Sequence, residues 1–98
     1  MDAQLPEVFK VELPDNSMAP RAPAGSFIEF TRGIEPIAGD GVLVRDRSGA
    51  FYFREYRIVR SGVWEAHAYN EAYKTLDSVR DGLEIIGVLT SVSTRWAR

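Results

Sequence analysis

The chain has 98 residues, of which 45% are hydrophobic, a size and composition typical of one folded domain rather than a disordered segment. Twelve basic and fourteen acidic residues give a net charge of −2, which argues against binding nucleic acid through bulk electrostatics. The absence of cysteine excludes disulfides, thiol catalysis and cysteine-based metal sites, and the single histidine, His67, disfavours a His-rich metal site or a Ser-His-Asp triad. We expect no metal and no cofactor.

The start of the chain lacks the charged and apolar pattern of a signal peptide. No apolar run approaches the roughly 20 residues that a membrane-spanning helix needs. We therefore expect a single cytoplasmic domain over residues 1–98, without membrane contact.

The first half of the chain shows two patterns typical of strands. Residues 7–13 alternate apolar and charged side chains, with Phe9 on the apolar face, and residues 26–31 form a short apolar run. Between them, residues 19–25 contain two prolines and a glycine, which predicts a loop or one short helical turn.

The second half begins with the clearest hairpin signal. The β-rich runs 42–47 and 50–59 are separated by Ser48-Gly49, a pair typical of tight turns. A further strand is expected over residues 63–68 after a second turn.

Residues 69–82 are polar and irregular, with room for one helical turn over 70–75. A long strand is expected over 83–94, where Gly87 predicts a bulge or bend. Short strands at close spacing predict a mostly β fold, a small curled antiparallel sheet with at most short helical turns.

One serine stands where a nucleophile would be placed. Ser17 follows a strand-ending turn and precedes Met18 and a proline-bounded loop, a position that can expose a hydroxyl near backbone N–H groups. The local sequence by itself favours the ordinary alternative, a serine that caps a turn.

The order of motifs along the chain resembles the LexA-like family, the C-terminal domains of LexA, phage repressors and UmuD (S24-type serine peptidases). The resemblance covers about residues 8–92. Its parts are a Ser-Met motif, a Gly-Asp pair before a hairpin, an Asn-x-x-Tyr segment and a closing Ile-x-Gly strand, represented here by Ser17-Met18, Gly39-Asp40, Asn70 to Tyr73 and Ile85 to Gly87. The resemblance implies a curled antiparallel sheet of the LexA/signal-peptidase type.

The resemblance also implies a Ser/Lys dyad, in which a neutral lysine removes the proton of the attacking serine. It places Ser17 at the nucleophile position and the neighbouring backbone of Met18 in the oxyanion region. The position of the general-base lysine falls on Arg54. Because an arginine is effectively always protonated in a protein, Arg54 is not expected to act as the base.

The remaining basic side chains are poor replacements for that lysine. Lys10 is predicted on the polar face of the first strand, and Lys74 in the irregular segment. His67 is more simply interpreted as a structural residue of a strand than as a substitute base.

The resemblance further implies a homodimer that uses the closing strand, 83–94, and Trp96; a terminal β-rich strand is expected to offer a free edge. Self-cleaving members cut a small-residue pair upstream of the serine and bind DNA through a separate N-terminal domain. Neither the cleavage segment nor the DNA-binding domain is recognisable in these residues, so no direct contact with nucleic acid is expected.

These observations lead to one preferred function and two alternatives. The preferred function is the oligomerisation or effector domain of a phage-type or SOS-type transcriptional repressor, with a serine-peptidase pocket that has lost catalysis. The first alternative is an active S24-type peptidase, or a related signal-peptidase-type enzyme, that uses Ser17 with an unidentified base. The second is a β-rich binding module with no repressor history, which would be a monomer without a cleft between Ser17 and Arg54. The aromatic cluster of Phe51, Tyr52, Phe53 and Tyr56 is also similar to a stacking platform for single-stranded nucleic acid, but core packing explains these residues more simply.

Overall fold

The computed structural model describes residues 7–19 and 22–93, and within them every regular element is a strand. In chain order, the strands are β1 (Val8–Glu12), β2 (Phe27–Thr31), β3 (Gly41–Arg45), β4 (Phe51–Arg60), β5 (Val63–His67), β6 (Leu76–Asp77) and β7 (Glu84–Ser93). In the described part of the chain, no helix is long and apolar enough to cross a membrane.

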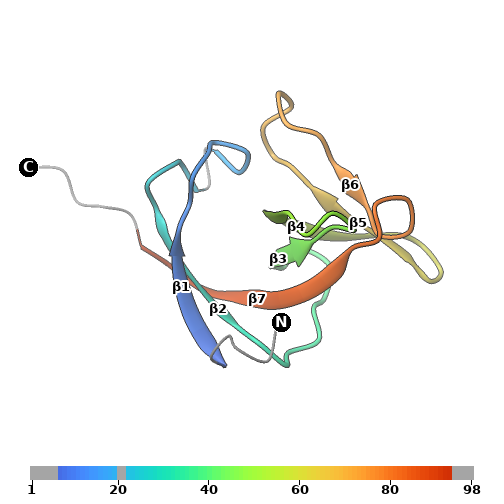
Figure 1. Cartoon of the computed structure of the whole chain (residues 1–98), viewed down its shortest axis with the longest axis horizontal. Helices are drawn as coiled ribbons and strands as arrows, with labels where there is room; N and C mark the ends of the chain where they lie inside the picture. Colours follow the sequence, from blue (N-terminus) through green and yellow to red (C-terminus); the bar gives the residue numbers. More distant parts are fainter. Residues whose placement is uncertain (1–6, 20–21, 94–98) are drawn as a thin grey trace, which may run out of the picture.

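All seven strands belong to one antiparallel sheet with the order β1-β2-β7-β3-β4-β5-β6. The sheet curls, so that β1 lies opposite β3 and β4, and β7 runs from one side of the curled sheet to the other (Figure 1). The predicted fold class, a mostly β curled antiparallel sheet, is therefore confirmed.

The predicted hairpin is formed by β3 and β4 around a short turn. Gly49 has a φ of 94°, a conformation that side chains with a Cβ rarely adopt, and the Asp46 carboxylate accepts bonds from the backbone N–H groups of Ser48 and Ala50. The sequence signalled the turn through its glycine, and the structure adds the aspartate that caps it.

The segment 69–82 was predicted to be irregular, and it contains a short strand that this prediction missed. Leu76 pairs with Ala66 of β5, and a strand of two residues is too short to leave a periodic pattern. Residues 70–75, where one helical turn was considered possible, contain a single turn, in which the Tyr73 N–H donates to the Asn70 carbonyl at 3.0 Å.

The closing strand is not the sheet edge that the sequence led us to expect. β7 lies between β2 and β3: Glu84–Val88 pairs with β3, and Val88–Ser93 pairs with β2. The expectation of a terminal edge strand was wrong for β7 as a whole, because two segments distant in sequence close around it. The residues of β7 beyond Val88 pair with β2 on one side, and on the other side they pair with none of the described strands. Trp96 lies outside the described residues.

Gly87 was predicted to mark a bulge, and the register of β7 against β3 does shift next to it: Leu43 pairs with Gly87 and Val44 with Ile85, which leaves Ile86 without a partner. A Cβ on Gly87 would lie 3.0 Å from the Cβ of Phe30. The glycine thus also allows β7 to approach β2 closely.

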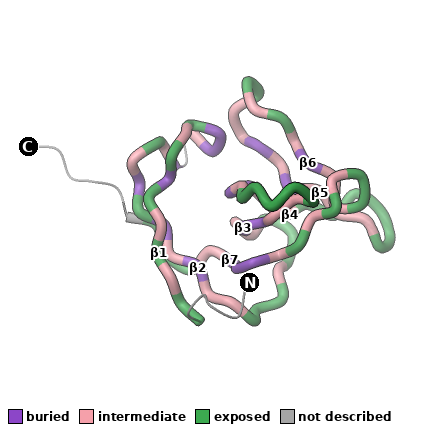
Figure 2. Tube along the Cα trace, in the orientation of Figure 1, coloured by how far each residue is buried: buried purple, intermediate pink, exposed green. Residues whose placement is uncertain are grey.

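The buried apolar side chains form two clusters, and they follow β3, β7 and the connection after β1 (Figure 2). The first cluster consists of Leu13, Met18, Ala22, Ile28, Phe30, Leu43, Phe53 and Ile86. The second cluster consists of Val42, Val44, Ala66, Leu76 and Val88. Because neighbouring residues of a strand point to opposite faces, β3 contributes Leu43 to the first cluster and Val42 and Val44 to the second.

Candidate active site

Ser17 lies in the connection that follows β1, and its position is set by two sets of hydrogen bonds. Its backbone N–H donates to the Asp15 carboxylate at 3.0 Å, a turn typical of aspartate. Its carbonyl accepts from the Asn70 N–H at 2.9 Å, and the Asn70 side chain donates to the Asn16 carbonyl at 3.1 Å. The turn is therefore held against the segment after β5, and Ser17 is 1% exposed.

Met18 follows the serine and points into the first cluster, where it is buried. Its carbonyl accepts from the Ala22 N–H at 3.0 Å, which closes the loop that the prolines predicted. The buried side chain of Met18 anchors this segment to the first cluster and thereby holds the neighbouring Ser17 in place. The role of this backbone in an oxyanion region stays a prediction.

Arg54 is brought to Ser17 by the register of the hairpin, in which it pairs with Val42. Its Nη1 donates to the Ser17 hydroxyl oxygen at 2.8 Å and to the Phe53 carbonyl at 3.0 Å. The guanidinium carbon lies 5.3 Å from the centre of the Tyr52 ring, within the range of a cation–π contact. The two residues that the sequence singled out are thus direct neighbours.

Burial shapes the electrostatics of this pair. Arg54 is only 3% exposed, and this desolvation lowers the pKa of its guanidinium from the ordinary value, while the negative charge of Asp15 opposes the shift. A guanidinium nevertheless stays protonated in proteins. Arg54 can therefore donate hydrogen bonds to Ser17 but cannot accept its proton.

The other basic residues do not reach the serine hydroxyl. The side chains of Lys10 and Lys74 are exposed, and Lys74 presents only its carbonyl to the Arg54 Nε, at 3.4 Å. His67 Nδ1 lies 3.2 Å from the Thr75 hydroxyl, and its ring packs edge-on against Tyr69. Among the described residues, only Arg54 forms a side-chain hydrogen bond with the Ser17 hydroxyl.

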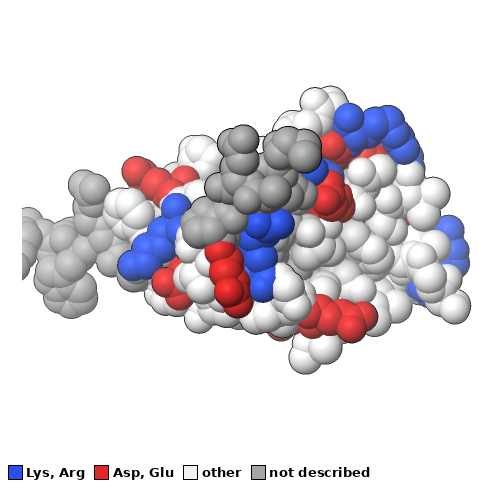
Figure 3. Space-filling view, turned by 60° about the horizontal axis from the view of Figure 1, so that its bottom comes forward, with Lys and Arg blue, Asp and Glu red and all other residues white. Residues whose placement is uncertain are grey.

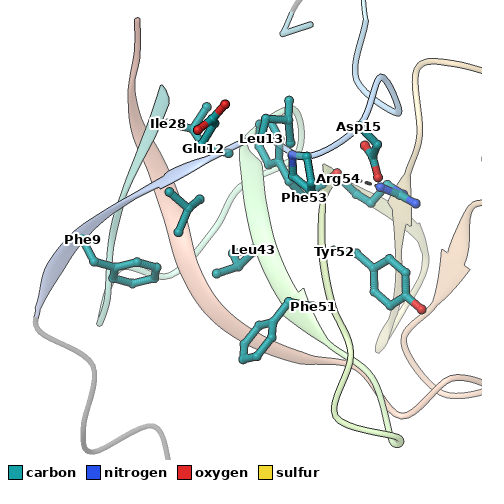
Figure 4. Close-up of a pocket in the computed structure, with 12 residues that line it drawn as sticks. Phe9, Glu12, Leu13, Asp15, Ile28, Leu43, Phe51, Tyr52, Phe53 and Arg54 are labelled. Carbon is teal, nitrogen blue, oxygen red and sulfur yellow. Dashed lines mark hydrogen bonds between the residues drawn. The ribbon is translucent and has the colours of Figure 1, made fainter. Parts of the chain in front are cut away.

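Sequence reasoning did not find the pocket that adjoins this pair, which has a volume of about 360 Å³. Apolar side chains make most of its wall, with Phe9 on β1 and Phe51 on β4 on opposite sides and Leu43 between them (Figure 4). Asp15 and Arg54 lie together at one end of the pocket. The alternating pattern over residues 7–13 and the aromatic residues over 51–56 predicted the two strands β1 and β4. These patterns did not predict that the curled sheet brings β1 and β4 face to face.

The site shows no arrangement for a metal. Within residues 7–19 and 22–93, no three histidine or carboxylate side chains are grouped as metal ligands.

A comparison of the sequence with known protein families identifies the family of this chain. The family model described as Peptidase S24-like matches residues 1–90. The chain belongs to this family. It includes the C-terminal domains of LexA, UmuD and phage repressors, so the resemblance noted in the sequence is confirmed. No curated protein matches the chain closely enough to add a relative.

Proposed function

We propose that this S24-like domain is the oligomerisation or effector domain of a phage-type or SOS-type transcriptional repressor, and that its serine-peptidase pocket no longer cleaves peptides. The observation that carries the proposal is the 2.8 Å hydrogen bond from Arg54 Nη1 to the Ser17 hydroxyl. A serine nucleophile needs a neighbouring group that accepts its proton, and a permanently protonated guanidinium occupies that place.

The proposal is tested with a peptide that contains an Ala-Gly bond, incubated with the protein at pH 7 to 10 and followed by mass spectrometry. We expect no cleavage above the background of the Ser17→Ala variant. Cleavage by the wild-type protein that disappears in Ser17→Ala would overturn the proposal and favour the active peptidase with another base.

Arg54→Lys is the matched variant for this experiment. A lysine in the same buried position can lose its proton, because desolvation lowers its pKa, and it would then act as a general base. We expect weak cleavage that rises with pH in Arg54→Lys and vanishes when Ser17→Ala is added.

Dimerisation is the second part of the proposal. It is supported by the half of β7 beyond Val88, whose backbone has no strand pairing on the side of β3, and by the exposed side chain of Val92. Sedimentation at micromolar concentration should show a homodimer, and Val92→Lys should shift it toward the monomer. A wild-type monomer at 100 μM would contradict this part.

We also propose that the domain works in the cytoplasm, without membrane contact and without touching nucleic acid itself. Basic and acidic side chains are interspersed on the face shown in Figure 3, which is unlike the single-signed surface that binds phosphate backbones. A fluorescent duplex at 50 mM salt should accordingly show no binding to the domain at micromolar concentration.

A further inference from the structure

The hydroxyl of Ser17 is enclosed by protein atoms. Ser17 is 1% exposed, and it is not among the residues that line the pocket between β1 and β4. A serine nucleophile has to contact the carbonyl carbon that it attacks, so an enclosed hydroxyl is not accessible to a peptide. Part of the chain must therefore move before a substrate or reagent can reach Ser17.

The connection between β5 and β6 lies against the turn that carries Ser17. We call residues 69–75 of this connection the strap. β1 is the first strand in the order of the sheet and β6 the last, yet the turn after β1 and the strap before β6 lie side by side at one end of the curled sheet (Figure 1). The strap thus bridges the two ends of the open sheet next to the serine.

Hydrogen bonds from Asn70 join the strap to the serine turn. The Asn70 N–H donates to the Ser17 carbonyl at 2.9 Å, and its side-chain amide donates to the Asn16 carbonyl at 3.1 Å. The side-chain oxygen of Asn70 accepts from the Ala72 N–H at 3.0 Å, which fixes the turn of the strap itself. Both of these bonds to the serine turn therefore depend on one residue.

The strap is anchored by apolar packing at its ends, whereas its middle is exposed. Tyr69 packs against the first cluster, and Leu76, directly after the strap, is buried in the second. Glu71 and Lys74 are exposed, and the Lys74 carbonyl accepts a long hydrogen bond of 3.4 Å from Arg54 Nε. Exposed segments held by hydrogen bonds open at a lower free energy than the core, so the middle of the strap can open without unfolding of the sheet.

We propose that the strap is an autoinhibitory cover of Ser17, which Asn70 holds closed and which opens by local release of its middle. While the strap is closed, no peptide reaches the hydroxyl, and release of the Asn70 bonds frees the serine turn. The inference deepens the proposed function and rests on its assignment of Ser17 to the peptidase pocket. It differs from the role of Arg54, because Arg54 takes the place of the base, whereas the strap controls access.

The test introduces a single thiol, which is possible because the chain has no cysteine. In Ser17→Cys the thiol takes the place of the hydroxyl. Its reaction with 5,5′-dithiobis(2-nitrobenzoate) at pH 8 is followed through the absorbance of the released thionitrobenzoate. With the strap closed, we expect a labelling rate at least about 100-fold below that of the same variant unfolded in urea.

Substitutions of Asn70 should open the strap. Asn70→Ala removes both side-chain bonds, and Asn70→Asp keeps the oxygen that accepts from Ala72 but loses the donor to Asn16. We expect either change to raise the labelling rate of the Ser17→Cys thiol about fivefold, a typical effect of losing one hydrogen bond. Glu71→Ala is the matched control: Glu71 is an exposed neighbour within the strap, so its loss should leave the rate unchanged.

A second thiol position separates opening of the strap from unfolding of the whole domain. Val44 is fully buried in the second cluster, so the thiol of Val44→Cys should be labelled slowly, and Asn70→Ala should not accelerate it. An equal acceleration of both thiols would overturn the inference. So would an unchanged rate at residue 17 in both Asn70 variants, or labelling of Ser17→Cys in water as fast as in urea.

The labelling rate measures access to residue 17 and does not depend on peptide cleavage. Cleavage of an Ala-Gly peptide by the wild-type protein would therefore overturn the proposed loss of catalysis without contradicting the strap. An unchanged labelling rate in the Asn70 variants would overturn the strap and leave the proposed function standing.

Discussion

The two buried clusters of the sheet differ in how they are closed. The second cluster is covered by β6 and by the turn that follows it, where Leu76 is 1% exposed. The first cluster, built around Phe30, is covered only in part, and the space left between β1 and β4 is the pocket beside Ser17. One sheet thus forms one closed core and a second core that is open at the pocket.

Arg54 stands at the border between these two regions. It pairs with Val42, a member of the second cluster, while its neighbour Phe53 belongs to the first. Neighbouring residues of a strand point to opposite faces, so the side chain of Arg54 lies on the face of the second cluster, while Phe53 points toward the first cluster.

The strongest test removes the centre of the first cluster. Phe30 is fully buried, with ring centres 5.8 Å from Phe9 and 5.5 Å from Phe53, so Phe30→Ala should lower the free energy of unfolding by about 3–5 kcal/mol. Urea unfolding measures the effect.

The matched variant in the second cluster is Leu76→Ala. Its cost should be about 2–3 kcal/mol, at the lower end of the range for buried leucine, because β6 has only two residues and can relax. A cost in urea unfolding that exceeds that of Phe30→Ala would contradict this comparison of the two clusters.

A smaller effect is expected when the buried cation is removed. Arg54→Met loses the hydrogen bonds to Ser17 and Phe53 but also removes a buried charge that forms no ion pair with the described residues. We expect the free energy of unfolding to change by no more than about 1 kcal/mol, and we expect this change to be an increase. A destabilisation above about 2 kcal/mol in urea would show that the hydrogen bonds of Arg54 outweigh the cost of burying its charge.

The smallest effect concerns acid. Hydrogen bonds from Ser48 hold the pKa of Asp46 below its ordinary value of 3.8, and those from the Arg80 backbone N–H and side chain do the same for Asp77 and Asp81 respectively. Carboxylates with a depressed folded-state pKa contribute stability above the unfolded value that is lost as pH falls through the folded value. Stability should therefore decline below about pH 4.

Amide exchange followed by NMR should locate this decline at the β3–β4 turn and the turn after β6 before it reaches Ser17. Asp46→Asn should show a smaller difference in urea midpoint between pH 7 and pH 3 than the wild-type protein. An unchanged difference would mean that these turns do not contribute to acid sensitivity.

Much of the fold was predictable, because the strands carry local signals. The alternation before Leu13 and the Ser48-Gly49 turn were sufficient to predict β1 and the hairpin. The short strand at Leu76 and the interior position of β7 were not predictable, because both depend on pairing with segments distant in the chain. The sequence singled out Ser17 and Arg54, which the structure brings into contact, but their roles stay a prediction and the neighbouring pocket was not predicted.

The amino-acid sequence by itself determined a mostly β domain that belongs to the S24-like family, and it predicted that Arg54 stands at the position of the family's lysine. These features are local or lie in the order of motifs, so they can be read without coordinates. Only the tertiary structure decided that Arg54 donates to Ser17, that it forms no ion pair with the other residues that the structure describes, and that β1 and β4 enclose an apolar pocket. The physical reason is that burial and charge compensation depend on which distant side chains the curled sheet brings together.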